Sequence, residues 1–175
     1  QYEDIEEQAN AYFQKIYQSE ESAREVVDMM KKWKASGTSR ENDIYACIIH
    51  NLLDEYRFFS NYPEKELRIT GILYGLLIKE ELVGSITLGT ALRYVLEALR
   101  KHPNQSVQSG KMFRFGMFAL EHFKERLPEW PQYCSQILEI GHLREGYAPL
   151  IGEIETAVAM EDSQSAGSSS AGPTA

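Results

Sequence analysis

The sequence predicts an all-α fold, and three observations support this class. Apolar residues recur at intervals of three and four, whereas strict alternation of apolar and polar residues is absent. Capping residues, glycines and prolines separate the periodic segments. Short turns between consecutive helices imply antiparallel neighbours, as in a helix bundle or an α-solenoid. No period of sequence identity is visible that would distinguish these two architectures.

Three helices are predicted in the N-terminal third of the chain. The first spans about 2–18 and carries one apolar stripe. The second runs from about Ser22, a candidate N-cap, to Ala35. The third begins after Ser39 and presents two neighbouring apolar ridges, which suits a helix packed between others. The ridges are Ile44, Ile48, Leu52 and Tyr56, and Tyr45, Ile49 and Leu53.

Five further helices are predicted in the remainder of the chain. They span about 63–81, 82–101, 111–127, 128–143 and 148–160. Pro63 suits the first position of its helix, because its missing N–H would have no partner there. Gly71 and Gly75 lower the helix propensity of the same segment but allow a second helix backbone to approach closely.

Length and composition predict one compact domain. A chain of 175 residues is long enough for one sizeable core, and we assign residues 1–160 to a single helical domain. The segment 161–175 is rich in Ser, Gly and Ala and is predicted to be a disordered linker, because it has little apolar surface to bury. We interpret the chain as a piece of a longer protein.

Net charge, cysteine content and the length of apolar runs indicate which partners and which cellular compartment suit the protein. A formal net charge of −8 argues against DNA binding and an extended nucleic-acid surface. Cys47 and Cys134 suggest neither a disulfide framework nor a zinc site, so a reducing compartment is expected, either cytoplasm or nucleus. Apolar runs are far shorter than the roughly 18 residues that span a bilayer. No membrane association is therefore expected.

The sequence contains two weak signals for chemistry. Glu139 and His142 have the Glu-x-x-His spacing of di-iron bundles, but a second copy of the motif is missing. Cys47 and His50 lie three residues apart in an apolar segment, which favours a buried thiol over a nucleophile. We therefore predict a protein that is not an enzyme and needs no metal or cofactor.

An aromatic cluster around Arg57 is a candidate for partner contacts. Tyr56 and Phe59 continue a core ridge of the third helix, whereas Phe58 and Tyr62 fall near the following turn. A charged guanidinium is costly to bury without a partner. The segment predicts a packed joint between two helices, with a possible contact at its rim.

The helix predicted at 111–127 is apolar on most of its sides. Its large apolar residues include Met112, Phe113, Phe115, Met117, Phe118 and Phe123. Such a helix is either enclosed by neighbouring helices or partly exposed as a contact surface of Met and aromatic type. Both interpretations stay open at this stage.

Five motifs, in this order, resemble one known family. They are "EDIEEQANAYFQKIY", "LLDEYRFFSNYPEKEL", "GTALRYVLEALRK", "KMFRFGMFALEHFKERL" and "PQYCSQILEIGHL". Together they are similar to the middle domain of the largest scaffold subunit of the CCR-NOT deadenylase complex. That domain is a helical-repeat domain of the type found in the middle of translation initiation factor 4G. The likeness runs from about Tyr2 to Met160.

The resemblance implies an α-solenoid of HEAT-like antiparallel helix pairs, with about ten helices in all. It implies a non-catalytic scaffold in mRNA deadenylation, mRNA decay and translational repression, as part of a multi-subunit complex. The implied partners are a DEDD-class deadenylase subunit and a DEAD-box RNA helicase. The alternative is an adaptor of translation-initiation type that clamps a DEAD-box helicase and contacts RNA directly, for which a basic surface is expected.

We predict that exposed side chains on three of these helices bind the partners. The candidates are Arg40, Arg57, Phe58 and Tyr62 near the third and fourth helices, and Phe113, Met117 and Phe118 on the helix at 111–127.

Overall fold

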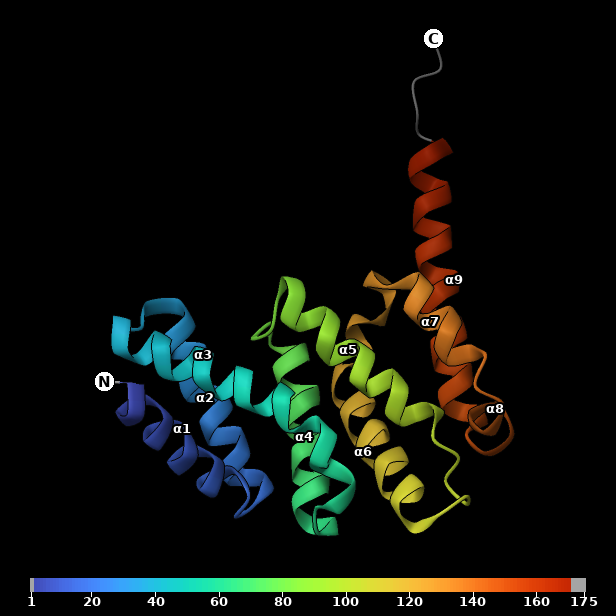
Figure 1. The fold of residues 1–175 in the computed structure, drawn as a ribbon. Coiled ribbons are helices and arrows are strands. Elements are labelled where there is room, and N and C mark those ends of the chain that lie inside the picture. The colour runs from blue at the N-terminus through green and yellow to red at the C-terminus, as the bar shows by residue number, and fades with distance from the viewer. Residues whose placement is uncertain (1, 171–175) are drawn as a thin grey trace. The chain divides into compact units, whose positions relative to one another are not determined.

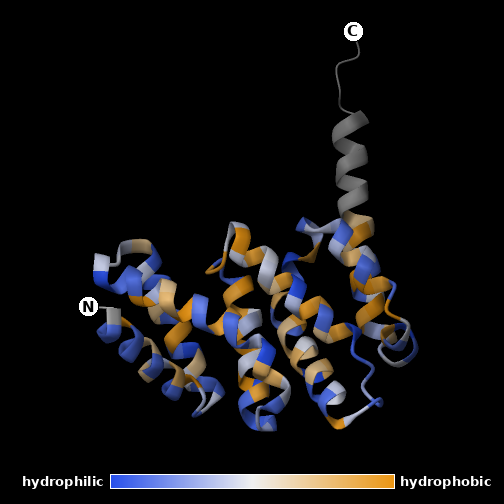
Figure 2. Ribbon diagram, viewed as in Figure 1, coloured by the Kyte–Doolittle hydropathy of each residue, from blue (hydrophilic) through white to orange (hydrophobic). Residues whose placement is uncertain are grey.

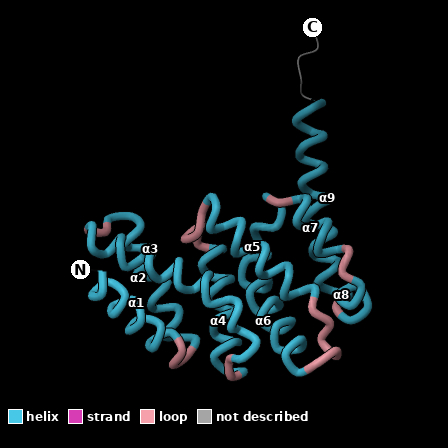
Figure 3. Tube along the Cα trace, viewed as in Figure 1, coloured by secondary structure: helices cyan, strands magenta, loops and turns pink. Residues whose placement is uncertain are grey.

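The computed structural model describes the backbone of residues 2–170 and the side chains of residues 3–160. The chain divides into two compact units, Gln1–Phe123 and Lys124–Ala175. Every regular element within the described residues is a helix, as the trace in Figure 3 shows. The all-α class predicted from the sequence is therefore confirmed.

The described part of the first unit contains six α-helices and one 3-10 helix (Figure 1). In chain order they are α1 (Tyr2–Ile16), α2 (Glu20–Ser36), α3 (Ser39–Asp54), η1 (Glu55–Asn61), α4 (Glu64–Lys79), α5 (Ser85–Arg100) and α6 (Val107–Phe123). Within this unit α1 packs on α3, α2 on α4, α3 on α5, and α4 on α6. Odd-numbered and even-numbered helices therefore form two layers, which is the packing of an α-solenoid.

Capping side chains define where α2 and α3 begin. Ser19 caps α2 by accepting a hydrogen bond from the backbone N–H of Ser22 at 3.0 Å. The cap thus lies three residues before the predicted one. Thr38, rather than Ser39, caps α3 in a reciprocal capping box with Glu41. In both cases a second hydroxyl residue close to the cap explains why periodicity alone misplaced the boundary.

The core of the first unit is centred on α4. Residues 69–78 are all buried, and the apolar and polar residues of the surrounding helices are intermixed along each helix in Figure 2. A Cβ atom at Gly71 would lie 2.8 Å from the carbonyl oxygen of Phe115, and one at Gly75 would lie 2.5 Å from that of Ala119. The close helix approach predicted for these two glycines is confirmed, and the partner is α6.

The second unit contains shorter elements. They are η2 (Lys124–Glu129), α7 (Pro131–Leu138), α8 (Gly141–Gly146) and α9 (Ala148–Ser170). The single helix predicted at 128–143 is split, because Glu139 is the C-cap of α7 and α8 starts at Gly141. Glu139 and His142 therefore do not project from one helix. The described residues contain no group of three or more His, Cys, Asp or Glu side chains placed to hold a metal ion.

The predicted helix count and C-terminal boundary differ from the structure. Residues 2–170 hold nine α-helices, compared with eight from periodicity and about ten implied by the resemblance. α9 continues to Ser170, past the predicted boundary at 160. Residues 171–175 lie outside the described residues, and the disordered linker at 161–175 stays a prediction. Within the described residues, no helix combines the length and apolar character needed to cross a bilayer.

Candidate interaction groove

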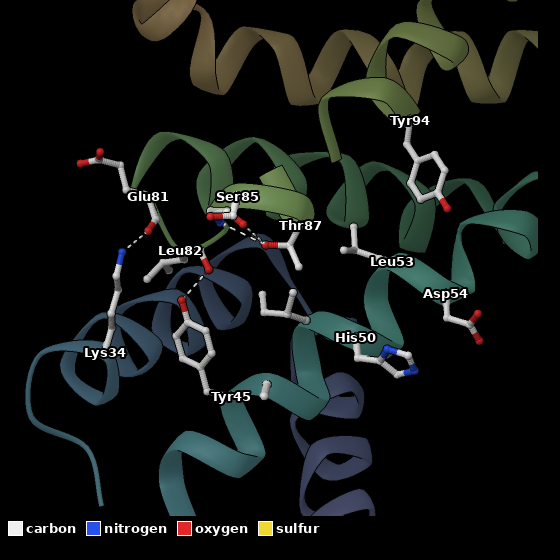
Figure 4. Close-up of a pocket in the computed structure, with 13 residues that line it drawn as sticks. Lys34, Tyr45, His50, Leu53, Asp54, Glu81, Leu82, Ser85, Thr87 and Tyr94 are labelled. Atoms are coloured by element: carbon white, nitrogen blue, oxygen red, sulfur yellow. Dashed lines mark hydrogen bonds between the residues drawn. The ribbon is translucent and has the colours of Figure 1, made fainter. Parts of the chain in front are cut away.

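A surface groove of about 730 Å³ lies between α3 and the connection from α4 to α5 (Figure 4). All of its lining residues belong to the first unit. They include Lys34, Tyr45, Ile49, His50, Leu53, Asp54, Leu82 and Tyr94.

The inside of the groove is apolar and its rim is polar. Ile49 and Leu82 are buried, with exposed fractions of 5% and 3%, and form the floor. Tyr45, Leu53 and Tyr94 are half-buried and form the sides. Exposed polar side chains of α3 stand at the edge. An apolar centre with a polar rim is the anatomy of a protein–protein interface.

Two hydrogen bonds hold the connection that forms one side of the groove. The Tyr45 hydroxyl donates to the carbonyl oxygen of Leu82 at 2.5 Å. The Lys34 ammonium donates to the carbonyl oxygen of Glu81, a residue whose φ of 58° turns the chain out of α4. Both bonds are drawn in Figure 4. The groove is therefore assembled from α2 and α3 together with this connection.

A parallel ring stack fixes the side chain of Tyr94. The rings of Tyr56 and Tyr94 lie 4.0 Å apart with an angle of 3° between their planes. The Tyr56 hydroxyl donates to the carbonyl oxygen of Tyr94 at 3.2 Å. Burial raises the pKa of Tyr56 well above its ordinary value, so this hydroxyl keeps its proton at neutral pH. The aromatic side of the groove is thus preorganised.

A large apolar side chain that does not line the groove is exposed between two residues that do. Ile86, in the first turn of α5, has an exposed fraction of 85%. Its neighbours Ser85 and Thr87 both line the groove. Figure 4 shows these two residues at the start of α5, facing the side chains of α3.

Replacing Tyr45 with phenylalanine is expected to lower the free energy of unfolding by about 1 kcal/mol at neutral pH, because Leu82 loses its hydrogen-bond donor. Burial raises the pKa of Tyr45 to about 12 from its ordinary value of 10.0. This contribution to stability is therefore complete below pH 10 and is lost as the pH rises towards 12. Urea unfolding of both proteins across this range measures the difference.

The matched control is Tyr12→Phe. The Tyr12 ring packs edge-on against Trp33 at 5.6 Å, and its hydroxyl makes no hydrogen bond within the described residues. This variant should keep the stability and pH dependence of the wild type. An equal change in both variants would contradict the role given to the Tyr45 hydroxyl.

The predicted contact residues of α3 and η1 lie outside the groove lining. Arg57 and Phe58 are exposed, with the guanidinium carbon 4.8 Å from the centre of the phenyl ring. Tyr62 is half-buried and donates its hydroxyl to a glutamate of η1 at 2.8 Å. Arg40, near the start of α3, forms an ion pair with Asp4. Their binding of partners stays a prediction.

The predicted contact residues of α6 are mostly enclosed. Phe113 has an exposed fraction of 1%, so the expectation that it is exposed is wrong. The reason is that α6 packs against both α4 and α5. Met117 and Phe118 are half-buried. Phe113 is therefore enclosed by neighbouring helices, whereas Met117 and Phe118 are only partly enclosed.

The groove residues were absent from the predicted contact set, although the sequence contained a signal for them. Tyr45, Ile49 and Leu53 form the second apolar ridge of α3. That ridge predicted burial against another helix, whereas the structure leaves it lining the groove. Leu82 and Tyr94 come from later in the chain, and no sequence pattern connects them to α3.

The groove does not carry an activated thiol. The side-chain amide of Asn51 donates to the Cys47 sulfur at 3.5 Å. Partial burial raises the pKa of Cys47, whereas a nucleophilic cysteine needs a lowered one. His50, its predicted partner in chemistry, stands at the groove edge.

The fold and the groove together define a helical-repeat domain with an apolar surface groove. A sequence model of the CCR4-NOT transcription complex subunit 1 TTP binding domain matches residues 1–166. The chain therefore belongs to this family.

Relatives from three organisms agree with this assignment. General negative regulator of transcription subunit 1 of Schizosaccharomyces pombe is 44% identical over 141 residues, which is 81% of this chain and 6% of that protein. CCR4-NOT transcription complex subunit let-711 of Caenorhabditis elegans is 39% identical over 138 residues, 78% of this chain and 5% of that protein. The subunit 1 protein of Saccharomyces cerevisiae is 32% identical over 135 residues, 77% of this chain and 6% of that protein. The chain thus spans a small part of the length of these relatives.

A solved structure shows the same fold. The N-terminal domain of yeast Not1 superposes with a TM-score of 0.78 at 30% identity, covering 89% of this chain and 28% of that structure. This match and the family match correct one expectation. The scaffold subunit implied by the resemblance is right, but the domain is the TTP-binding domain and not the middle domain of the initiation-factor type. Apolar ridges specify how repeat helices pack, and this packing does not mark a domain's position in a long scaffold.

Proposed function

We propose that this domain is a non-catalytic docking module of the CCR4-NOT scaffold subunit, and that its groove binds a short apolar segment of a partner protein. The observation that carries the proposal is the groove between α3 and the α4–α5 connection. Its volume of about 730 Å³ suits a few side chains and not a whole domain. Its sides are held by hydrogen bonds and ring stacking, so little ordering is needed on binding.

The partner that we propose for the groove is TTP, because the description of the matching family names it. The groove offers buried Ile49 and Leu82 to apolar anchor side chains. Ile86 is exposed between Ser85 and Thr87, which line the groove, and could contact a bound segment. Binding at such a groove concentrates its energy in a few anchors at the apolar centre.

A charge placed in the groove or next to it should weaken this binding. We expect Leu53→Glu to weaken the binding of purified TTP by about thirtyfold, because hot-spot contacts contribute about 2 kcal/mol or more. Ile86→Glu changes a side chain that is 85% exposed, so it tests the surface with little risk to the fold. Isothermal titration calorimetry with each variant measures the dissociation constant, and thermal unfolding confirms that the variants are folded.

The matched control is Val107→Glu. Val107 has an exposed fraction of 76% and does not line the groove. A glutamate in the first turn of α6 also suits the helix dipole. This variant should bind TTP as the wild type does. Wild-type affinity in both Leu53→Glu and Ile86→Glu would place the binding surface elsewhere.

The scaffold role includes two further partner predictions. Docking of a DEDD-class deadenylase and a DEAD-box RNA helicase was implied by the likeness to a middle domain, and the corrected domain removes much of that support. Separate pull-downs of each protein with the folded domain test both. The RNA-contacting adaptor has less support, because the net charge is −8. We propose that the domain acts in mRNA decay through the complex, in a reducing compartment that suits its free cysteines.

A further inference from the structure

We propose a second docking site in the first unit, a basic cleft that binds a phosphorylated serine or threonine in a segment of a protein partner. The cleft lies between η1, the end of α5 and the N-terminal half of α6, and its volume is about 480 Å³. Its cationic residues are Arg57, Arg100 and Lys101. The remaining lining residues are Tyr56, Ser60, Glu97 and Met112.

The cleft carries an excess of positive charge that the protein neutralises only in part. Three cations and one carboxylate, Glu97, line it, so the lining has a net charge of two. Arg100 and Lys101 form no ion pair within the described residues. Arg57 reaches Asp54 at 3.7 Å, but both side chains are more than 60% exposed, and Asp54 does not line the cleft. The chain as a whole has a charge of −8, so this local excess is unusual.

The end of α5 explains only part of this charge. Cations at the C-terminus of a helix offset a dipole of about half an elementary charge. Arg100 is the last residue of α5 and Lys101 is its C-cap, so one of these two cations would suffice to offset the dipole. Arg57 comes from a different element. After the dipole is offset, about 1.5 positive charges of the lining remain to be balanced by a ligand.

A phosphate group matches the charge and the donors of the cleft. A phosphorylated side chain carries about −1.5 to −2 at neutral pH and has three acceptor oxygens. Guanidinium groups bind such oxygens in a fork, and a lysine adds a point charge. Ser60 supplies a hydroxyl at the same place. Recognition of phosphorylated segments by clusters of arginine is a recurring mode.

The surroundings favour a peptide over RNA. Phe58, next to Arg57, has an exposed fraction of 44% and offers an apolar platform for neighbouring residues of a peptide. RNA binding needs many phosphate contacts along an extended basic surface. This cleft is small and belongs to an acidic protein. No residue lines both the cleft and the groove, so the variants that test one site leave the lining of the other unchanged.

The test is a nuclear magnetic resonance titration of the whole ¹⁵N-labelled chain with the peptide Ac-Ala-Ala-pSer-Ala-Ala-NH2. We expect the amide resonances of Ser60, Arg100 and Lys101 to shift. The double variant R100A/K101A should bind the peptide at least about tenfold more weakly, since contacts to a charged group are lost. Affinity should also fall between pH 7.5 and pH 5, because the second pKa of the phosphate is about 6.

The control variant is K65A/R68A, which removes the same charge from exposed positions of α4 outside the cleft. It should bind the peptide as the wild type does. The proposal is overturned if the unphosphorylated peptide causes the same shifts or if the control loses affinity equally. It is also overturned if a ten-nucleotide adenylate RNA occupies the cleft more tightly than the peptide, or if no resonance shifts.

Discussion

Replacing Phe115 with alanine is expected to lower the free energy of unfolding of the first unit by about 3–5 kcal/mol, the range for large aromatic side chains in a core. Phe115 has an exposed fraction of 1%. Its ring centre lies 5.1 Å from that of Tyr74, 5.3 Å from that of Phe59 and 6.1 Å from that of Tyr56. Truncation leaves a cavity where three aromatic rings converge, and a well-packed site collapses only in part.

Tryptophan fluorescence during urea unfolding measures this loss. The chain has two tryptophans, one in each unit. In a Trp130→Phe background, Trp33 therefore reports on the first unit alone. Phe58→Ala is the matched control, because its ring is 44% exposed. We expect it to change stability by about 0.5 kcal/mol or less. Similar losses at the two positions would contradict the assignment of Phe115 to the core.

Replacing Gly75 with alanine is expected to destabilise the first unit by about 2–3 kcal/mol through overpacking. The new Cβ would lie 2.5 Å from the carbonyl oxygen of Ala119 and 2.6 Å from the Cβ of His122. One of these contacts is backbone, which cannot move away without shifting α6. Relief therefore requires α4 and α6 to separate, and their shared core residues lose contact.

Gly89→Ala is the control for this effect. Gly89 lies inside α5, and a Cβ there would meet no atom within 4 Å. Alanine has the higher helix propensity, so this change should stabilise the unit by up to about 1 kcal/mol. The same urea unfolding experiment compares both variants in the Trp130→Phe background. A stabilising effect of Gly75→Ala would show that α4 and α6 do not pack closely.

Local pattern predicted the exposure of some candidate contact residues correctly and that of others wrongly. Arg57 and Phe58 were selected because a charged and an aromatic residue fall near a turn, and both are exposed. Phe113 was selected by residue type on a helix that is apolar all round, and it is buried because two helices cover it. The predicted contact residues did not include Arg100 and Lys101. Cations at the C-terminal end of a helix are already explained by its dipole.

The sequence by itself determined the all-α class, the approximate helix positions and the close packing at Gly71 and Gly75, because these depend on periodicity and on the absence of a side chain. Only the tertiary structure decided which apolar ridge of α3 is covered. The ridge that begins with Ile44 is largely buried, whereas the ridge that begins with Tyr45 lines the groove. Periodicity gives the direction of a side chain around its own helix. Periodicity does not predict the path of the α4–α5 connection, which brings Leu82 to Tyr45 across 37 residues and leaves the groove open.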